Sequence, residues 1–156
     1  MSNISTKKIA IFYYSYHTNS TKKLCEAINK DYPNIEIFSL TDGEAQADIS
    51  EYDYIGFASG IYWFDFGSPV YEHLKKIKNL NGKPCFALST SGSASDKYRF
   101  YLQKTIEEFG GKFLDGFACQ GFVNYFPLNI FGGKNKGKPD AADIKNCEEF
   151  LQKILI

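Results

Sequence analysis

The sequence predicts an α/β fold, a three-layer sandwich in which helices cover both faces of a five-stranded parallel sheet. Short apolar runs alternate along the chain with longer amphipathic stretches, which is the pattern of repeated strand–helix–strand units. The apolar runs are nearly continuous, as expected for central strands that are buried on both faces. A chain of 156 residues has the length of one ordinary domain, so we expect a single domain over residues 1–156.

Five apolar runs are expected to form the strands. Each is bounded by Gly, Pro or polar residues, and the second run is the weakest. In chain order they are Lys8–Tyr14, Ile35–Leu40, Tyr54–Ser59, Pro84–Thr90 and Lys112–Cys119. Successive parallel strands need right-handed crossovers, which the stretches between them are long enough to provide.

Four amphipathic stretches are expected to form the helices. The first places Leu24, Cys25 and Ile28 on one face. The third stops at a Gly-Gly pair, and the fourth follows Pro-Asp, which are ordinary signals for a helix end and a helix start. The predicted helices are Thr21–Lys30, Pro69–Ile77, Asp96–Phe109 and Ala141–Leu155.

Composition and charge exclude several classes of function. Eighteen Lys and Arg residues balance eighteen Asp and Glu residues, so we expect no nucleic-acid partner and no anionic membrane partner. The four cysteines are far apart and form no Cys-x-x-Cys pair, as expected for buried thiols in a reducing compartment. The longest apolar stretch near the N-terminus, Ile9–Tyr14, is too short for a signal peptide or membrane span. We therefore expect a cytoplasmic protein, and the spacing of His, Cys and acidic residues predicts no metal site and no catalytic triad.

Ligands of open α/β sheets bind beyond the carboxyl ends of the strands, near the point where the strand order reverses. Three segments lie at such ends here, and each has an unusual composition: Ser15–Thr21, Ser59–Ser68 and Ser91–Lys97. These three segments are the candidate site.

The first segment consists mainly of small hydrogen-bonding residues, with neither Lys nor a carboxylate: Ser15, Tyr16, His17, Thr18, Asn19, Ser20 and Thr21. The start of a helix offers free N–H groups and a partial positive charge, which together bind phosphate without a basic side chain. The alternative is an ordinary capped turn from strand to helix. The chain has no G-x-x-x-x-G-K-[ST] and no G-x-G-x-x-G motif, which disfavours other phosphate loops.

Aromatic residues crowd the second segment, and aromatic residues make up 17% of the chain. Tyr62, Trp63, Phe64 and Phe66 are expected in a loop, where a flat conjugated ligand would give the rings a stacking partner. The alternative is that these rings pack beneath the following helix. In the third segment, small residues around Gly92 allow backbone amides to approach the edge of a ligand.

These three segments and the strand order resemble the flavodoxin family over nearly the whole chain. The family's first loop has the form T/S-x-T-G-N-T. If Thr21 is aligned with its last Thr, Ser20 stands at the usual Asn and Asn19 at the usual Gly. A shift by one residue restores Asn19 to the Asn position but disturbs the register of the following helix.

The resemblance implies the strand order 2-1-3-4-5 and an FMN cofactor. It implies that Ser15–Thr21 hold the phosphate, with a further donor from His17, and that Tyr62 or Trp63 stacks on the flavin ring. Trp63 is our first choice for that role. The edges of the ring would be bonded by backbone groups of Ser59, Gly60, Ile61, Tyr62, Trp63 and Phe64, and of Ser91, Gly92 and Ser93.

By this resemblance we expect an FMN-binding electron carrier that cycles through one-electron steps between redox partner proteins, rather than an enzyme. The alternatives are an FMN-dependent NAD(P)H reductase of quinone or flavin type, and a cofactor-free interaction domain. Phe122–Phe131 is an apolar segment that would cover the flavin, form a dimer interface or act as a lid. Ser15–Thr21 and Ser59–Ser68 contain no Lys or Arg, so we expect a low potential for the second electron.

Overall fold

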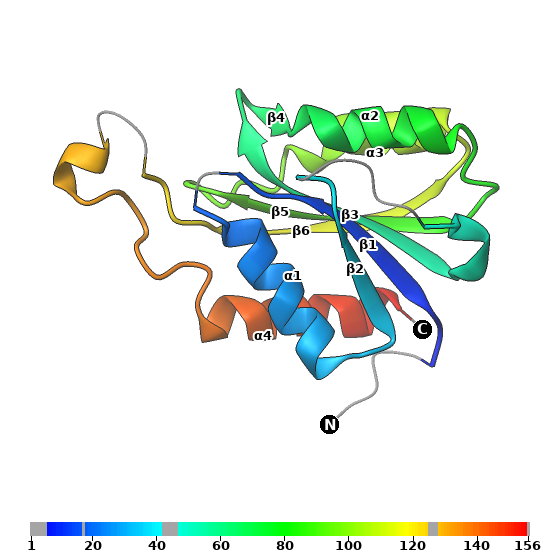
Figure 1. The fold of residues 1–156 in the computed structure, drawn as a ribbon, viewed down its shortest axis with the longest axis horizontal. Coiled ribbons are helices and arrows are strands. Elements are labelled where there is room, and N and C mark those ends of the chain that lie inside the picture. Colours follow the sequence, from blue (N-terminus) through cyan, green and yellow to red (C-terminus); the bar gives the residue numbers. More distant parts are fainter. Residues whose placement is uncertain (1–5, 17, 42–46, 125–127, 156) are drawn as a thin grey trace.

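The computed structural model describes residues 6–16, 18–41, 47–124 and 128–155. Its sheet contains β1 (Ile9–Tyr14), β2 (Ile35–Ser39), β3 (Tyr54–Tyr62), β5 (Pro84–Ser91) and β6 (Lys112–Gln120), all parallel and in the spatial order β2-β1-β3-β5-β6. This arrangement confirms the predicted α/β fold and strand order (Figure 1). A sixth, short strand, β4 (Asp65–Phe66), pairs antiparallel with the end of β3 and was not predicted.

Helices cover both faces of the sheet. Helices α1 (Ser20–Asp31) and α4 (Ala141–Ile154) lie on one face, and α2 (Ser68–Ile77) and α3 (Arg99–Glu108) lie on the other (Figure 1). Helix α3 begins three residues after the predicted start at Asp96, and two short 3-10 helices, η1 (Ile49–Glu51) and η2 (Leu128–Phe131), complete the described elements.

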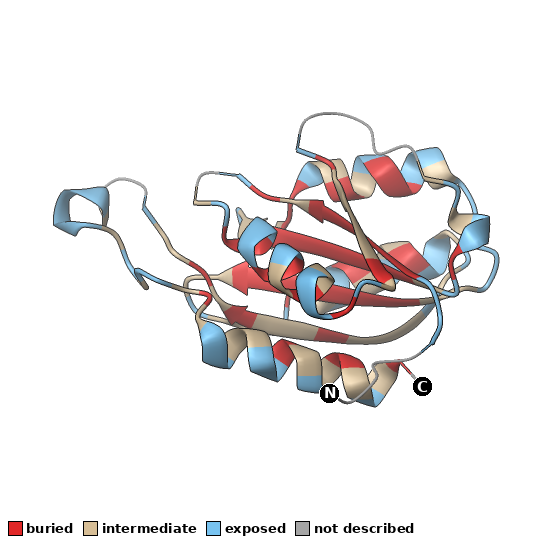
Figure 2. Cartoon of the chain, turned by 60° about the horizontal axis from the view of Figure 1, so that its bottom comes forward, coloured by how far each residue is buried: buried red, intermediate tan, exposed pale blue. Residues whose placement is uncertain are grey.

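The alternation of side chains along β1 divides the core in two. Ile9 and Ile11 belong to the cluster that contains residues of α1 and α4, whereas Ala10 and Phe12 belong to the cluster that contains residues of α2 and α3. Figure 2 shows the buried strands enclosed by helices whose outer faces are exposed. At Gly56 a Cβ atom would lie 2.4 Å from Cζ of Phe86, so this central position requires glycine for close packing.

Beyond β6 the chain leaves the sheet as a projecting arm, which we define as residues 122–124 and 128–138 (Figure 1). The arm leads back to α4, whose start is fixed by a reciprocal capping box between Asp140 and Asp143. The arm and the segments that follow β1, β3 and β5 all lie at the carboxyl end of the sheet. Among the described helices, none has the length and apolar character that crossing a membrane requires.

Candidate functional site

The turn between β1 and α1 contains a left-handed residue, Asn19, with φ 56° and ψ 29°. Asn adopts this conformation more readily than other non-glycine residues. Helix α1 begins at the next residue, Ser20. This helix start agrees with the alignment that sets Asn19 at the family's Gly and Thr21 at its last Thr.

Most hydroxyl groups of this turn already have partners within the protein. Thr18 Oγ1 donates to the carbonyl oxygen of Phe122 at 2.7 Å, and Ser20 Oγ accepts from the N–H of Phe122 at 2.9 Å. The hydroxyls of Thr21 and Thr90 are 2.9 Å apart. The turn is therefore fastened to the base of the arm and to the end of β5, and its hydroxyls serve first to hold its shape. His17 lies outside the described residues.

At the start of α1, two backbone donors have no acceptor in the part of the chain that the structure describes. The N–H of Lys22 donates to Ser15 Oγ at 3.2 Å, and that of Lys23 donates to the carbonyl of Asn19 at 2.9 Å. The N–H groups of Ser20 and Thr21 have no acceptor among the described residues. These two donors, with the positive end of the helix dipole, suit an anion such as phosphate.

The second segment was expected to be a loop, and that expectation was wrong. Strand β3 continues to Tyr62 and pairs with β4, so that Ile61 faces Phe66 and Tyr62 faces Asp65. Trp63 is one of the two residues that form the turn of this hairpin. Two-residue hairpin turns usually contain Asn or Gly, so the pair Trp63-Phe64 did not indicate a hairpin in the sequence.

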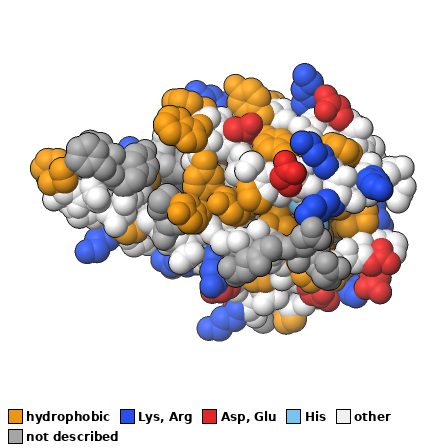
Figure 3. Space-filling view, turned by 45° about the horizontal axis from the view of Figure 1, so that its top comes forward, with side chains coloured by type: hydrophobic (Ala, Val, Ile, Leu, Met, Phe, Trp, Pro, Cys, Tyr) orange, Lys and Arg blue, Asp and Glu red, His pale blue; other side chains and the backbone are white. Residues whose placement is uncertain are grey.

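The turn is both strained and exposed. Trp63 has φ 51° and Phe64 has φ 67°, which is the left-handed backbone that a two-residue hairpin turn requires and that bulky side chains disfavour. Trp63 is 95% exposed and Phe64 is 73% exposed. Figure 3 shows hydrophobic side chains gathered over the end of the molecule from which the arm projects. Phe66, in contrast, is buried in the core with Val70, so the packing alternative holds for this one ring.

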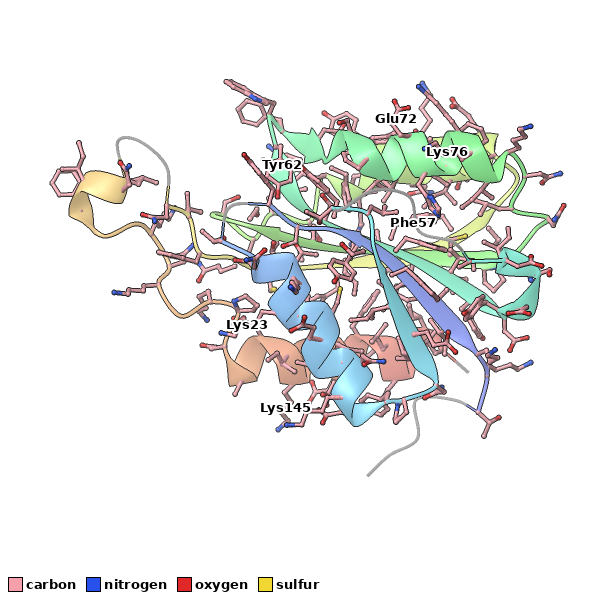
Figure 4. The ribbon with its side chains drawn as sticks, viewed as in Figure 1. Lys23, Phe57, Tyr62, Glu72, Lys76 and Lys145 are labelled. Atoms are coloured by element: carbon pink, nitrogen blue, oxygen red, sulfur yellow. The ribbon has the colours of Figure 1, made fainter. Side chains whose placement is uncertain are left out.

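Tyr62 joins the hairpin to the first turn. Its hydroxyl accepts from the N–H of Tyr16 at 3.1 Å, and its ring makes an edge contact with Tyr14 at 5.6 Å. Burial raises the pKa of the Tyr62 phenol. A Cβ at Gly60 would lie 2.8 Å from the Tyr62 hydroxyl, so glycine there leaves room for the ring, which lies at the end of β3 (Figure 4).

Ser59 supports the hairpin from below. It is fully buried, its hydroxyl donates to the carbonyl of Gly60 at 2.6 Å, and it accepts from the N–H of Gly67 at 2.9 Å. Both hydrogen bonds of the Ser59 hydroxyl are made within the protein. The side chain therefore stabilises the hairpin and is not expected to contact a ligand.

The third segment has an unpaired polar atom. Ser91 Oγ is buried and has no hydrogen-bond partner among the described residues. Gly92 follows it at the end of β5, and Ser93 is exposed. A buried hydroxyl without a partner costs free energy, and the polar edge of a ligand at this end of the sheet would supply one.

Sequence reasoning expected Phe122–Phe131 to cover the flavin, form a dimer interface or act as a lid, but it missed the residues farther along the arm. Nδ2 of Asn135 donates to the carbonyl of Gly92 at 2.9 Å, and Lys134 pairs with Val123 at the base of the arm. Lys134 and Asn135 lie beyond Phe131 and were not counted among the site residues, although β6 is the neighbour of β5 and ends at the same edge. That adjacency was the available signal.

The first turn, the hairpin, the third segment and the base of the arm therefore meet at one edge of the sheet. Together they provide free amide donors, exposed aromatic rings and an unpaired hydroxyl, which fit a phosphate attached to a flat conjugated ring. Within the described residues, no group of three or more His, Cys, Asp or Glu side chains is placed to hold a metal ion.

A family model described as a flavodoxin domain matches residues 10–132. The chain belongs to the flavodoxin family. An uncharacterized protein of Methanocaldococcus jannaschii is 35% identical to this flavodoxin-family chain over 150 residues, which cover 95% of the chain and 98% of the relative.

Solved structures share the fold at low sequence identity. A Fusobacterium nucleatum flavodoxin bound to flavin mononucleotide has a TM-score of 0.59 and 15% identity, with 96% of this chain and 98% of that chain covered. An NADPH-quinone reductase from P. pentosaceus has a TM-score of 0.62 and 9% identity, with 96% and 98% covered. The fold is therefore shared by a protein named as a flavodoxin and by one named as an NADPH-quinone reductase.

Proposed function

We propose that this chain binds FMN at the carboxyl edge of β1, β3 and β5, and that it carries single electrons between redox partner proteins. The observation that carries the proposal is the strained Trp63-Phe64 turn, which presents two exposed aromatic rings on a hairpin that Tyr62 joins to the turn before α1. Such strain is found where function requires it. The four free, buried cysteines support a reducing compartment, and we place the carrier in the cytoplasm.

The residues of the site would divide the work as follows. The N–H groups of Ser20 and Thr21 would hold the phosphate, Trp63 would stack on the ring, and Ser91 Oγ with the backbone of Gly92 would bond the ring edge. When bound, FMN supplies both one-electron and two-electron chemistry. The protein contributes binding, orientation and the electrostatic environment of the ring.

A reductase on the same site is the second candidate. The arm presents Ile130, 65% exposed, and Phe131, 84% exposed, which would cover a substrate pocket if a second subunit or a substrate packed against them. The resemblance in fold to the NADPH-quinone reductase is compatible with this alternative.

The first experiment measures FMN binding by quenching of flavin fluorescence. Wild type is expected to bind, and Trp63→Ala is expected to bind about tenfold more weakly through the loss of stacking and of apolar contact. Phe131→Ala, which removes another exposed ring from the arm (84% exposed, against 95% for Trp63), is the matched control and should leave the affinity unchanged. Unchanged affinity of Trp63→Ala would remove Trp63 from the stacking role, and no uptake by wild type would leave the cofactor-free interaction domain.

The second experiment follows the visible spectrum of the FMN-loaded protein during stepwise anaerobic reduction. Two resolved one-electron steps are expected for the carrier. Direct bleaching in one two-electron step on addition of NADH or NADPH would support the reductase instead.

A further inference from the structure

The base of the arm brings an ammonium group to the third segment of the site. Val123 and Lys134 exchange two backbone hydrogen bonds, of 2.8 and 2.7 Å. The next residue, Asn135, donates from its side-chain amide to the carbonyl of Gly92 at 2.9 Å. A Cβ atom at Gly92 would lie 4.0 Å from Nζ of Lys134. The Lys134 side chain therefore extends toward the end of β5, where the ring edge is proposed to bind.

The charge of Lys134 is not offset by a carboxylate. Among the described residues, no Asp or Glu forms an ion pair with it, whereas Lys138 in the same segment pairs with Asp140 at 2.9 Å and with Asp143 at 3.2 Å. The two lysines thus differ in role: Lys138 fastens the start of α4, and Lys134 keeps its charge available at the edge of the sheet.

The hydrogen-bond pattern assigns Lys134 to the ring and not to the phosphate. Backbone groups of successive residues in an extended chain point to opposite sides. The N–H and carbonyl of Phe122 face Ser20 and Thr18 of the first turn, whereas those of Val123 face Lys134. One extended segment therefore separates the backbone of Lys134 from the first turn, while its ammonium group lies 4.0 Å from a Cβ built at Gly92.

We propose that Lys134 raises the reduction potential of the cofactor by placing a positive charge beside the edge of its ring. This inference rests on the proposed FMN site. A flavin ring that accepts two electrons and one proton from a reductant gains one negative charge, which a neighbouring ammonium group stabilises. The first turn and the hairpin contain no Lys or Arg, and Lys134 of the arm then supplies the positive charge that they lack. The reduction potential is therefore higher than those two segments alone would give.

The test compares midpoint potentials of FMN-loaded wild type, Lys134→Gln and Lys134→Arg, measured by equilibrium reduction with dithionite against a reference dye. Lys145→Gln removes the same charge from α4, on the face of the sheet that α1 and α4 cover (Figure 4), and is the matched control. Lys134→Gln is expected to weaken the binding of fully reduced relative to oxidised cofactor about fivefold, the range of one solvent-screened charge pair. As a shift in the mean of the two one-electron potentials, this is about 20 mV. Lys134→Arg should keep the wild-type potential, and Lys145→Gln should not change it.

Dissociation constants of oxidised FMN and of riboflavin complete the test. Both should change little in Lys134→Gln. A variant that loses affinity for FMN but not for riboflavin would place the ammonium group at the phosphate, and an unchanged potential would show that it does not act on the ring; either result overturns the inference. Failure of wild type to bind either flavin would instead refute the proposed function itself.

Discussion

Most of the left-handed backbone at non-glycine residues lies at the candidate site. Asn19, Trp63, Phe64, Ala94 and Asn135 have positive φ and belong to the segments that meet at the carboxyl edge of the sheet, whereas Lys78 and Asn81 lie between α2 and β5. Asn tolerates this conformation, whereas aromatic residues pay about 1–3 kcal/mol for it. The conformational free-energy cost is therefore largest in the hairpin turn, where two exposed aromatic residues adopt a backbone conformation that their side chains disfavour.

Relief of this strain should separate stability from binding. In the double variant Trp63→Asn with Phe64→Gly, the turn has the sequence that its backbone prefers. We expect the free energy of unfolding without cofactor to rise by about 1 kcal/mol or more, while affinity for FMN falls about tenfold. Chemical denaturation and FMN titration of the same samples measure both effects.

Trp63→Ala is the control for this prediction, because it removes the indole without providing a residue that favours positive φ. It should lose affinity and gain no stability. A double variant less stable than wild type would mean that the two rings contribute packing energy in the free protein.

At the scale of elements, the strands and helices that a local hydrophobic pattern determines could be predicted from the sequence. Five apolar runs and four amphipathic stretches correspond to the five parallel strands and four α-helices, with boundary differences such as the start of α3 at Arg99. Strand β4 was missed because Trp63-Phe64 gives no turn signal. Lys134 was missed because its position depends on pairing with Val123 across the arm, a contact that no local pattern encodes.

Helices α1 and α4 bring two carboxyl groups together. The Glu148 carboxyl is in hydrogen-bonding contact with Asp31, and burial, followed by that hydrogen bond and charge, raises the pKa of Glu148 to about 7. The groove between the helices is also lined by Lys30 and Lys145. An unfolded Glu has a pKa near 4.3, so between about pH 4.3 and pH 7 the folded chain binds more protons than the unfolded chain, and this pair makes stability fall as the pH rises.

Glu148→Gln should remove this contribution. Relative to wild type, the variant is expected to be more stable at pH 8, by no more than about 1 kcal/mol because solvent screens a partly exposed pair, and to gain nothing at pH 4. Thermal unfolding across this range is the measurement, with exposed Glu149→Gln on the same helix as control. A gain of equal size at both pH values would show that packing, and not the proton, is responsible.

At the scale of the whole molecule, both halves of the core enclose thiols. Cys25, Cys119 and Cys147 lie in the half that contains α1 and α4, and Cys85 lies in the other. Burial raises the pKa of Cys85 and of Cys119 to about 12 and raises those of Cys25 and Cys147 as well. A thiol that remains protonated and covered is a poor nucleophile.

The native protein is therefore expected not to react with an aromatic disulfide reagent at pH 8, and four thiols should react after denaturation. Because the thiols sit in both halves of the core, their slow labelling in native buffer should report the opening of the whole fold. A single fast-reacting thiol in native buffer would reveal a local opening beside that residue.

The pairing of Val123 with Lys134 has a practical consequence. Two backbone hydrogen bonds close the arm where it leaves the body, so the tip beyond them can be exchanged with little cost to folding. A short peptide tag or an environment-sensitive dye grafted between these two residues would project from the edge where the cofactor is proposed to bind, and would report docking events at that end of the molecule without a change to the sheet.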